Sequence, residues 1–376
     1  MDDTYDIIIV GAGPAGSSAA QAAAEKGVNV LLIDQRQRIG VPVQCGEFVP
    51  QWISRYAPVS SNCVLQTVET MVTHLPDRST FEMKSPGYML DRSLFDKELA
   101  ASAILEGARI LVQTRVTGLS SDGITIEKGG EKKNIRSKVV IGADGSHSAV
   151  AGCMGQPLPR RIVALQYEVV IPCRQDHVDI FFDQAFEGGY AWLFPKGTTA
   201  NVGLGVISRK ASILPTLLNN FLDKLIDSKN LTDLQIVGKT GGSIPCGRPR
   251  QAVFGNVLLA GDAAGHAHPI TGAGILNAVN GDRMARRIAA EAVLENDLHH
   301  LEDYETEWRE TFGSSLIHGA SKREFLEENW NSPGTDFKEL IRQTWIGFKE
   351  YHKDRREHNA SVAAVPPLAG LACETE

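Results

Sequence analysis

The feature that most constrains the fold is a glycine turn between a short apolar run and an alanine-rich helical pattern. Residues 5–10 (YDIIIV) predict a buried strand, Pro14 to Lys26 predict a helix, and 28–34 (VNVLLID) predict a second strand. Strand, turn, helix and strand within about thirty residues form a βαβ unit, whose crossover makes the two strands parallel neighbours. The pattern therefore predicts an α/β fold.

The glycine turn reads Gly11-Ala-Gly13-Pro-Ala-Gly16 and opens the helix directly after the strand. Gly11 permits the tight turn, Gly13 lets a pyrophosphate approach the backbone, and Gly16 lets the helix pack closely on the strand. Asp34 ends the second strand, where a carboxylate can accept hydrogen bonds from a ribose diol. Together these residues predict a dinucleotide site.

Composition excludes several classes of protein. Hydrophobic residues make up 43% and charged residues 22%, which are globular proportions, and a net charge of −7 without a basic block argues against nucleic-acid binding. The six cysteines include no Cys-x-x-Cys pair, so we expect neither a disulfide framework nor a zinc knuckle but reduced, cytoplasmic thiols. Neither a secretory signal nor a transmembrane window is evident, so any membrane contact is expected to be peripheral.

Beyond the first unit, the chain predicts a nucleotide domain that a second domain interrupts. Prolines break residues 35–86 into expected loops and short strands that reach over the ligand, and an amphipathic helix is expected at 90–107. Strong alternation over 160–207 predicts an antiparallel sheet with one covered face. GNVLLAGDAAG at 255–265 then rebuilds a nucleotide-domain strand, so that domain is discontinuous in sequence.

A second fingerprint indicates which dinucleotide binds. Asp262 follows a buried strand, and Gly272 and Gly274 lie at the start of a helix. Asp262 can bind ribityl hydroxyls, while the backbone N–H groups of Gly274 and Ile275 can stabilise negative charge on the N1/O2 edge of a reduced flavin. NAD would not require this second site, so FAD is the expected cofactor.

Three elements together resemble FAD-dependent oxidoreductases with the para-hydroxybenzoate hydroxylase fold. They are GAGPAG with Asp34, IGADGSHS at 141–148, and LLAGDAAG followed by PITGAG. In that superfamily the middle element usually runs Asp-Gly-x-x-Ser-x-x-Arg, and this chain has Ala151 at the arginine position. The departure argues against hydroxylase-style NADPH handling.

Further matches narrow the resemblance to the geranylgeranyl reductase family. GYAWLFPKG at 189–197 is similar to that family's Tyr-x-Trp-x-Phe-Pro-Lys signature, and QCGE at 44–47 sits where the family carries its active-site Cys-(Gly/Ala)-Glu. LDRSLFDKELA at 90–100 matches its Arg-x-x-x-Asp helix. By this resemblance Arg92 and Val116 would contact FAD.

The resemblance implies an α/β architecture with a discontinuous, Rossmann-like FAD-binding domain, an inserted antiparallel β-sheet substrate domain and a C-terminal helical segment. The expected parts are 1–157 plus 246–296 for the FAD-binding domain, with part of 40–90 contributing to the active site, 158–245 for the β-rich domain, 297–358 for the helices and 359–376 for a flexible tail.

The expected activity is saturation of C=C bonds of an isoprenoid chain, by hydride from reduced flavin and a proton from the protein. An unactivated alkene is protonated through a cation-like state, so aromatic faces help. Tyr190 and Trp192 lie two apart on a strand and so share a face. The expected catalytic residues are Cys45, Glu47, Tyr190 and Trp192, and the expected cofactor-binding residues are Gly11, Gly13, Ala15, Gly16, Asp34, Cys45, Gly46, Arg92, Val116, Asp262, Gly272, Gly274 and Ile275.

Plainer interpretations stay open for several of these residues. Tyr190 and Trp192 could be core residues, Cys45 a small buried hydrophobe, and Glu47 structural. His266 and His268 form a His-x-His pair but lack a third ligand, so we expect no metal and place them in the isoalloxazine pocket or against loop carbonyls.

Three other functions compete with the reductase. A flavin monooxygenase would use the same fold and is the main alternative. A halogenase would carry Trp-x-Trp-x-Ile-Pro and a lysine between Lys26 and Lys84, which this chain lacks. A non-enzymatic flavoprotein would bind FAD structurally or pass electrons to a partner. For the reductase, we expect a prenyl-chain small molecule or lipid as substrate and a nicotinamide or ferredoxin-like electron donor.

Overall fold

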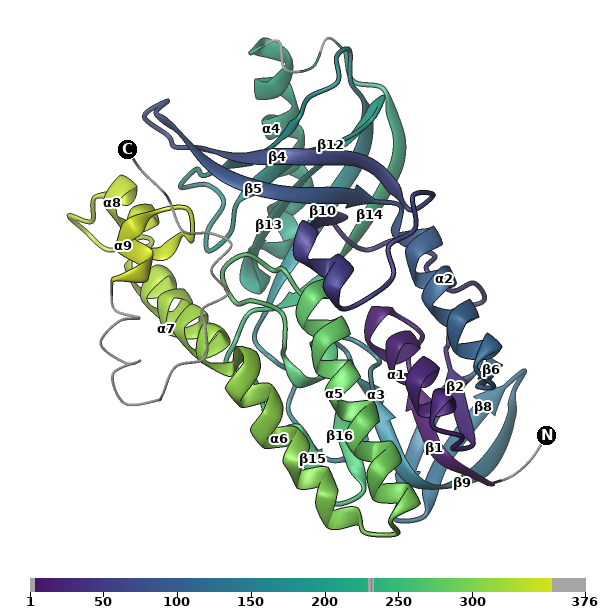
Figure 1. Ribbon diagram of the computed structural model, residues 1–376. Helices are drawn as coiled ribbons and strands as arrows, with labels where there is room; N and C mark the ends of the chain where they lie inside the picture. Colours follow the sequence, from purple (N-terminus) through teal and green to yellow (C-terminus); the bar gives the residue numbers. More distant parts are fainter. Residues whose placement is uncertain (1–3, 229–230, 232, 354–376) are drawn as a thin grey trace.

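Two large β-sheets, each with eight strands, form the framework (Figure 1). The structure is a computed structural model and describes residues 4–228, 231 and 233–353. In the first sheet the order is β15-β16-β9-β1-β2-β6, and β7 and β8 form an antiparallel extension on β9. Its strands are β1 (Thr4–Val10), β2 (Val30–Ile33), β6 (Arg109–Leu111), β7 (Arg115–Ser120), β8 (Gly123–Lys128), β9 (Glu131–Gly142), β15 (Val253–Phe254) and β16 (Val257–Leu259).

The centre of the first sheet is parallel and fully buried. β1 pairs with β2 on one side and with β9 on the other, both in parallel register. Both faces are covered, which explains why β1 and β2 are continuous apolar runs instead of alternating ones. Three helices lie side by side over this sheet (Figure 1): α1 (Pro14–Glu25), α2 (Arg92–Leu105) and α5 (Ile275–Leu294). The predicted α/β fold class and the βαβ unit are confirmed.

The three fingerprint glycines differ in the space around them. Gly11 has a φ of +102°, and a Cβ there would lie 2.4 Å from the Ala143 carbonyl oxygen. A Cβ on Gly16 would lie 1.9 Å from the carbonyl oxygen of Gly11, so helix and turn are in direct contact. A Cβ on Gly13 would meet nothing within 4 Å. Gly13 therefore faces open space, as a ligand-binding position requires.

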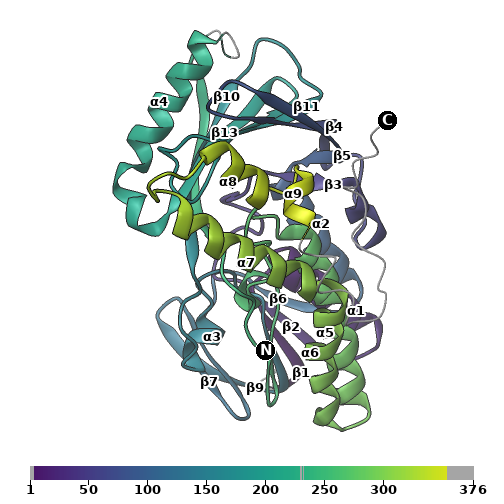
Figure 2. The same cartoon turned by 90° about the vertical axis from the view of Figure 1, so that its left-hand side faces the viewer.

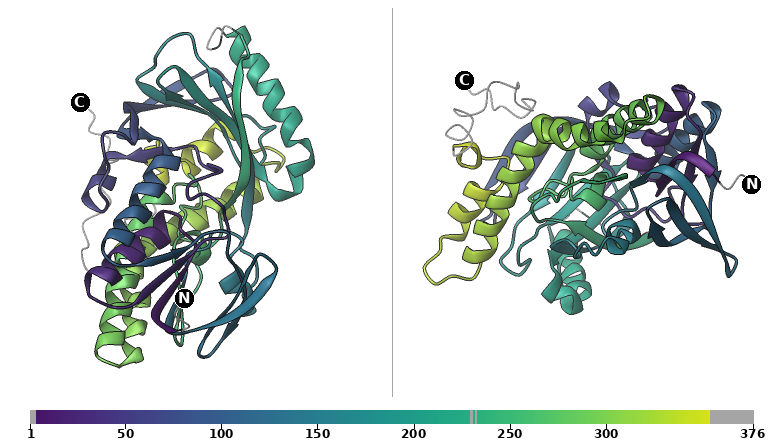
Figure 3. Two further views of the ribbon diagram at one scale, coloured as in Figure 1. Left: turned by 90° about the vertical axis from the view of Figure 1, so that its right-hand side faces the viewer. Right: turned by 90° about the horizontal axis from the view of Figure 1, so that it is seen from below.

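The second sheet has the order β14-β10-β13-β12-β11-β4-β5-β3. Its outer face packs on α4 (Leu214–Asp227), and Figure 3 (left view) shows α4 on one side of the sheet and the C-terminal helices on the other. Its strands are β3 (Phe48–Pro50), β4 (Val64–His74), β5 (Thr80–Leu90), β10 (Arg161–Val170), β11 (His177–Phe181), β12 (Ala191–Lys196), β13 (Thr199–Ile207) and β14 (Ile236–Pro245).

The expectation of loops and short strands before the second domain is wrong for residues 64–90. These residues form β4 and β5, each eleven residues long, and β4 pairs in parallel with β11. Pro86 lies inside β5, where the register with β4 shifts between Val68 and Thr70. The bulge accommodates a residue that has no N–H for the ladder. The second sheet therefore includes strands from outside 158–245.

The C-terminal helices fold back over the inner face of the second sheet. A nearly continuous helical arm runs from α6 (Asp303–Trp308) through a π-helical turn into α7 (Ser314–Asn329), and Figure 2 shows it crossing between the two sheets. The shorter α8 (Phe337–Thr344) and α9 (Lys349–His352) follow. Trp345, between them, donates from Nε1 to Thr73 Oγ1 over 3.1 Å.

Two further expectations concern parts of the chain that the structure does not describe in full. Residues 354–358 of the expected helical segment and the expected flexible tail at 359–376 lie outside the described residues. Among the helices that are described, none is both long and apolar enough to cross a membrane.

The glycine geometry predicts different costs for two alanine substitutions. Gly16→Ala forces a methyl group onto backbone and should lower the free energy of unfolding by about 3 kcal/mol or more. Gly13→Ala has open space and a compatible φ of −78°, so its effect on stability should stay within about 0.5 kcal/mol. Urea unfolding of the apoprotein measures both. Equal losses would show that Gly16 does not fix the helix against the turn.

Candidate functional site

The Cys45-Gly46-Glu47 segment is held against the inner face of the second sheet. Gln166 donates to the Cys45 carbonyl over 3.1 Å, and Asn201 donates to the Gly46 carbonyl over 3.2 Å. A Cβ on Gly46 would lie 3.0 Å from the Phe194 ring, so glycine allows the segment to lie close to β12. The predicted Cys-Gly-Glu segment and the Tyr-x-Trp-x-Phe strand therefore lie together.

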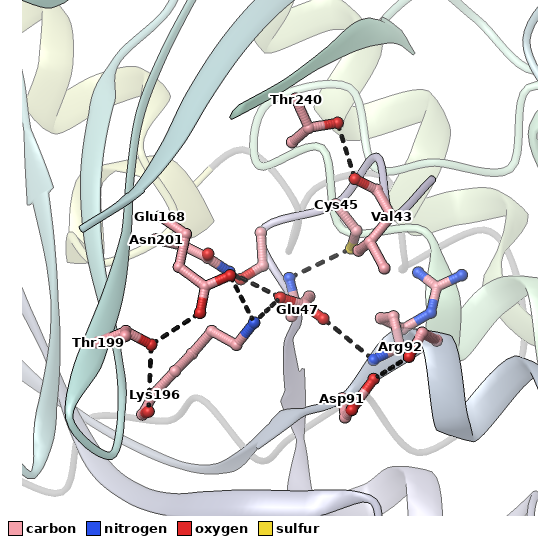
Figure 4. Close-up of polar contacts among 12 residues, drawn as sticks. Val43, Cys45, Glu47, Asp91, Arg92, Glu168, Lys196, Thr199, Asn201 and Thr240 are labelled. Carbon is pink, nitrogen blue, oxygen red and sulfur yellow. Dashed lines mark hydrogen bonds and ion pairs between the residues drawn. The ribbon is translucent and has the colours of Figure 1, made fainter. Parts of the chain in front are cut away.

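Glu47 is the centre of the polar contacts in Figure 4, and its side chain is almost fully buried. Its carboxylate accepts from Lys196 Nζ at 2.6 Å, from Asn201 Nδ2 at 2.9 Å and from the backbone N–H of Arg92 at 3.0 Å. Its own backbone has a φ of +69°, in the left-handed region that non-glycine residues seldom adopt. These contacts join the second sheet to the start of α2.

The lysine of this pair stays charged. Burial on its own would lower the pKa of Lys196, but the carboxylates of Glu47, Glu168 and Asp91 together outweigh burial and raise that pKa. Lys196 Nζ also lies 3.6 Å from Glu168. Both oxygens of the Glu47 carboxylate are thus engaged by donors, one of them charged.

Cys45 lies beside a fixed cation. Burial raises the pKa of its thiol, and the Arg92 guanidinium and the N–H of Glu47, 3.2 Å from Sγ, offset this only in part. Arg92 forms a two-point ion pair with Asp96, both contacts being 2.9 Å, and Asp96 holds the pKa of Arg92 above its usual value although burial acts in the opposite direction. Cys45 is therefore a protonated thiol at neutral pH.

Tyr190 and Trp192 point to the same face of the second sheet, as their spacing predicts, and away from the neighbouring buried residues Ala191 and Leu193. Their rings meet edge to face with centroids 6.0 Å apart. Trp192 Nε1 donates to Gln166 Oε1 over 2.9 Å, and the Tyr190 hydroxyl donates to the Thr271 carbonyl. Trp192 is buried, with 8% of its surface exposed, and Tyr190 is partly buried against the same core cluster, so both rings link the sheet to its surroundings.

Thr271 belongs to residues 266–274, the loop before α5, which we call the flavin loop. Within it Gly272 has a φ of +69°, and a Cβ there would lie 3.3 Å from Ile244 on β14. Gly274 is the N-cap of α5 and Ile275 its first residue. The second fingerprint is therefore brought against both the second sheet and the Tyr190 hydroxyl.

The two fingerprints adjoin each other at the carboxyl edge of the first sheet. A Cβ on Gly261, the residue before Asp262, would lie 3.1 Å from the Cβ of Ala15 in the first turn of α1. Asp34 accepts from the N–H groups of Ala12 at 2.8 Å and Arg36 at 2.7 Å, one on each carboxylate oxygen, and each oxygen can accept a further hydrogen bond, such as one from a ribose hydroxyl.

Helix starts and one carboxylate fit an anionic dinucleotide. α1 and α5 start at Gly13 and Gly274 with no side-chain cap, whereas α2 and α8 are capped by Asp91 and Asp336. Uncapped N–H groups favour phosphate or a reduced flavin. Asp262 accepts no hydrogen bond from any described residue, and burial raises its pKa to about 6, against a smaller effect of Arg92. Ribityl hydroxyls would supply the missing donors.

Two other expected positions lie in the core. The Val116 side chain on β7 is buried in the core of the first sheet, so only its main chain could contact FAD. Ala151, at the position of the superfamily arginine, is also buried, in the short helix α3 (Ala149–Cys153). Asp144 accepts from the N–H groups that open this helix, at 2.6 and 3.2 Å. The Asp-Gly element is therefore a helix cap.

The two histidines are in different surroundings. His266 is fully buried against Trp308 and Phe312, with neither ring nitrogen hydrogen-bonded among the described residues, and burial lowers its pKa to about 3. His268 Nδ1 accepts from the N–H of Thr271 at 3.3 Å, so it shapes the flavin loop. In the described part of the chain no three His, Cys, Asp or Glu side chains form a metal-binding group.

Sequence reasoning missed the residues that hold Cys45 and Glu47 in place. In the sequence, Lys196 stands out only as part of the aromatic signature. Gln166, Asn201 and Asp96 do not stand out as individual residues. Lys196 lies 149 residues and Asn201 154 residues after Glu47 in the sequence. The Arg-x-x-x-Asp spacing does contain a signal for Asp96, because i and i+4 residues on a helix are neighbours.

Removal of Lys196 should be costly because Glu47 would keep a buried, unpaired charge. Lys196→Met should lower the free energy of unfolding by about 3–5 kcal/mol, and adding Glu47→Gln should recover part of that loss. Lys224→Met is the matched control: its exposed pair with Asp183 should be worth less than about 1 kcal/mol. Urea denaturation compares the variants, and similar losses for both lysines would contradict a buried ion pair.

Comparisons with known proteins identify the family of the chain. Residues 6–154 match a family model described as FAD dependent oxidoreductase, and residues 161–244 match one described as geranylgeranyl reductase catalytic domain. The digeranylgeranylglycerophospholipid reductase 2 of Methanococcoides burtonii is 36% identical over 365 residues, covering 88% of this chain and 87% of that protein.

Solved structures agree as well. A geranylgeranyl bacteriochlorophyll reductase-like protein of Thermoplasma acidophilum superposes with a TM-score of 0.83 at 27% identity, covering 94% of this chain and 99% of that one. A flavin-dependent brominase shares the fold alone, with a TM-score of 0.69 at 17% identity and 91% of each chain covered. FAD is therefore the cofactor, and the chain belongs to the geranylgeranyl reductase family of FAD-dependent oxidoreductases.

Proposed function

We propose that the protein uses reduced FAD to saturate the C=C bonds of geranylgeranyl-type chains on a glycerophospholipid, the substrate class named for its relative. The observation that carries the proposal is the set of contacts that links three groups. Gln166 donates to the Cys45 carbonyl and accepts from Trp192, and the Tyr190 hydroxyl donates to Thr271 in the loop before the uncapped start of α5. A proton source, aromatic faces and a flavin-binding helix start are the parts that this reduction needs.

Reduction adds two hydrogens to each C=C bond, one as hydride and one as proton. Bound reduced FAD supplies the hydride. We assign the proton to Cys45 Sγ, because the thiol is protonated at neutral pH and the thiolate that remains faces Arg92 and the Glu47 N–H. A proton from water then restores the thiol.

Glu47 acts through the segment that contains Cys45. Its carboxylate is engaged by Lys196, Asn201 and the N–H of Arg92, so we assign it a positioning role and not that of an acid. Tyr190 and Trp192 would stabilise positive charge on the alkene carbon through their ring faces. We further propose that a nicotinamide or ferredoxin-like donor reduces the flavin, and that membrane contact is peripheral.

An anaerobic assay tests the proposal. Enzyme whose flavin has been reduced chemically is mixed with digeranylgeranyl glycerophospholipid, geranylgeranyl diphosphate or a saturated control lipid, and the products are analysed by mass spectrometry. A gain of 2 Da per reduced bond, with matching flavin reoxidation, supports the reductase. Products that gain oxygen, and form only when O₂ is admitted, would instead identify a monooxygenase.

Cys45→Ala should separate chemistry from cofactor binding. Loss of the proton donor should lower the rate of alkene reduction by about 10²-fold or more while the FAD content stays unchanged. Cys63→Ala is the control, since that buried thiol donates to Glu98 outside the site and should affect stability alone. Single-turnover flavin reoxidation measures the rate. Unchanged turnover with lowered stability would make Cys45 a packing residue.

FAD binding should depend on pH through Asp262. The carboxylate has a pKa of about 6 in the free protein, and hydroxyl donors stabilise its ionised form. Affinity should therefore rise as the pH increases from 5 to 7 and level off above the pKa. Flavin fluorescence titrations measure this. Asp262→Asn should bind FAD more weakly and lose the pH dependence, and the same slope in that variant would assign it to another group.

A further inference from the structure

Arg323 is a buried arginine that connects the flavin loop to the aromatic strand. It lies on α7 and is 1% exposed. Its Nε donates to the Pro269 carbonyl in the flavin loop over 3.0 Å, and its Nη1 donates to the carbonyl of Gly188, two residues before Tyr190. One planar guanidinium therefore bridges main-chain atoms of the two segments that the proposed reaction must hold together.

The surrounding contacts make this bridge tight. Gly319, one turn earlier on α7, has no room for a side chain, because a Cβ there would lie 3.0 Å from both the His268 ring and Pro269. Gly188 has a φ of +69°, and its Cβ would lie 2.4 Å from Ile207. The Tyr190 hydroxyl provides a second link by donating to Thr271 in the same flavin loop.

The charge of Arg323 is poorly compensated for such deep burial. The Glu327 carboxylate lies 3.8 Å from Nε, beyond hydrogen-bond distance, and its other oxygen binds Arg160. Burial lowers the pKa of Arg323, with Glu327 and the Cys246 thiol opposing this only in part. An apolar side chain would fill such a position at a smaller desolvation cost. The contribution of the arginine therefore lies in what its two donors hold.

We propose that Arg323 is a positioning residue for alkene reduction, which sets the spacing between the flavin loop and the strand that carries Tyr190 and Trp192. The substrate side of this inference rests on the proposed function, whereas the flavin side does not. Misplacement of reacting groups by about 1 Å can cost about 10²-fold in rate, so a link at this junction has a large effect on catalysis.

Arg323→Lys tests the bridge because it keeps the positive charge but replaces the planar fork with one ammonium group, which cannot hold both carbonyls in the same way. We expect kcat to fall about tenfold or more, within the range for misplaced reacting groups, with the FAD content unchanged. We also expect FAD to dissociate several-fold faster. Arg248→Lys is the control. Arg248 is exposed and pairs with Glu324, which lies on α7 as Arg323 does, and the variant should give wild-type values.

A double-mutant cycle with Tyr190→Phe distinguishes positioning from general support of the fold. Both side chains link the same two segments, so their effects on kcat and on FAD dissociation should be less than multiplicative when combined. Fully multiplicative effects, or an Arg323→Lys variant that loses thermal stability but keeps wild-type kcat and FAD dissociation, would overturn the proposal. If the wild-type protein reduces no isoprenoid, the proposed function fails, and the FAD dissociation rates alone decide the role of Arg323.

Discussion

The buried carboxylate of Glu47 is the interaction on which the rest of the site depends. It accepts hydrogen bonds from the second sheet through Lys196 and Asn201 and from the start of α2 through the N–H of Arg92. One side chain thus fixes the segment that contains Cys45 between the two sheets. A charge buried this deeply is stable only with its partners present, so the domains can associate in few other arrangements.

The cofactor edge follows a different physical rule. There α1 and α5 start without side-chain caps, Gly13 has open space beside it, and Asp262 accepts no hydrogen bond from the described residues. Asp91 caps α2 and Asp336 caps α8, but α4, α6 and α7 also start without a side-chain cap, so a missing cap points to a ligand only together with the surroundings of Gly13 and Asp262. Groups that are costly to leave unpaired occur where a ligand pairs them, which is how a folded protein stores binding energy for its cofactor.

Sequence alone predicted what local geometry determines. The need for glycine at Gly11 and Gly16 follows from the tight turn after β1 and from the close packing of α1 on that turn, and the shared face of Tyr190 and Trp192 follows from strand periodicity. It failed where the decisive partner is distant in sequence. The long strands β4 and β5 pair through a bulge that accommodates Pro86, and Lys196, the ion-pair partner of Glu47, lies 149 residues later in the sequence, on β12.

The contacts of Glu47 show what a motif alone does not contain, namely the partners of each side chain. In a sequence, a carboxylate beside a cysteine indicates an acid, because both groups could deliver a proton. In the structure the carboxylate is paired with Lys196 and held with a left-handed backbone, whereas burial raises the pKa of the neighbouring thiol although Arg92 lies beside it. Burial disfavours the charged form of a thiol, while an ion pair compensates a buried charge. The proposed roles, Cys45 as proton donor and Glu47 as the group that positions it, rest on this difference.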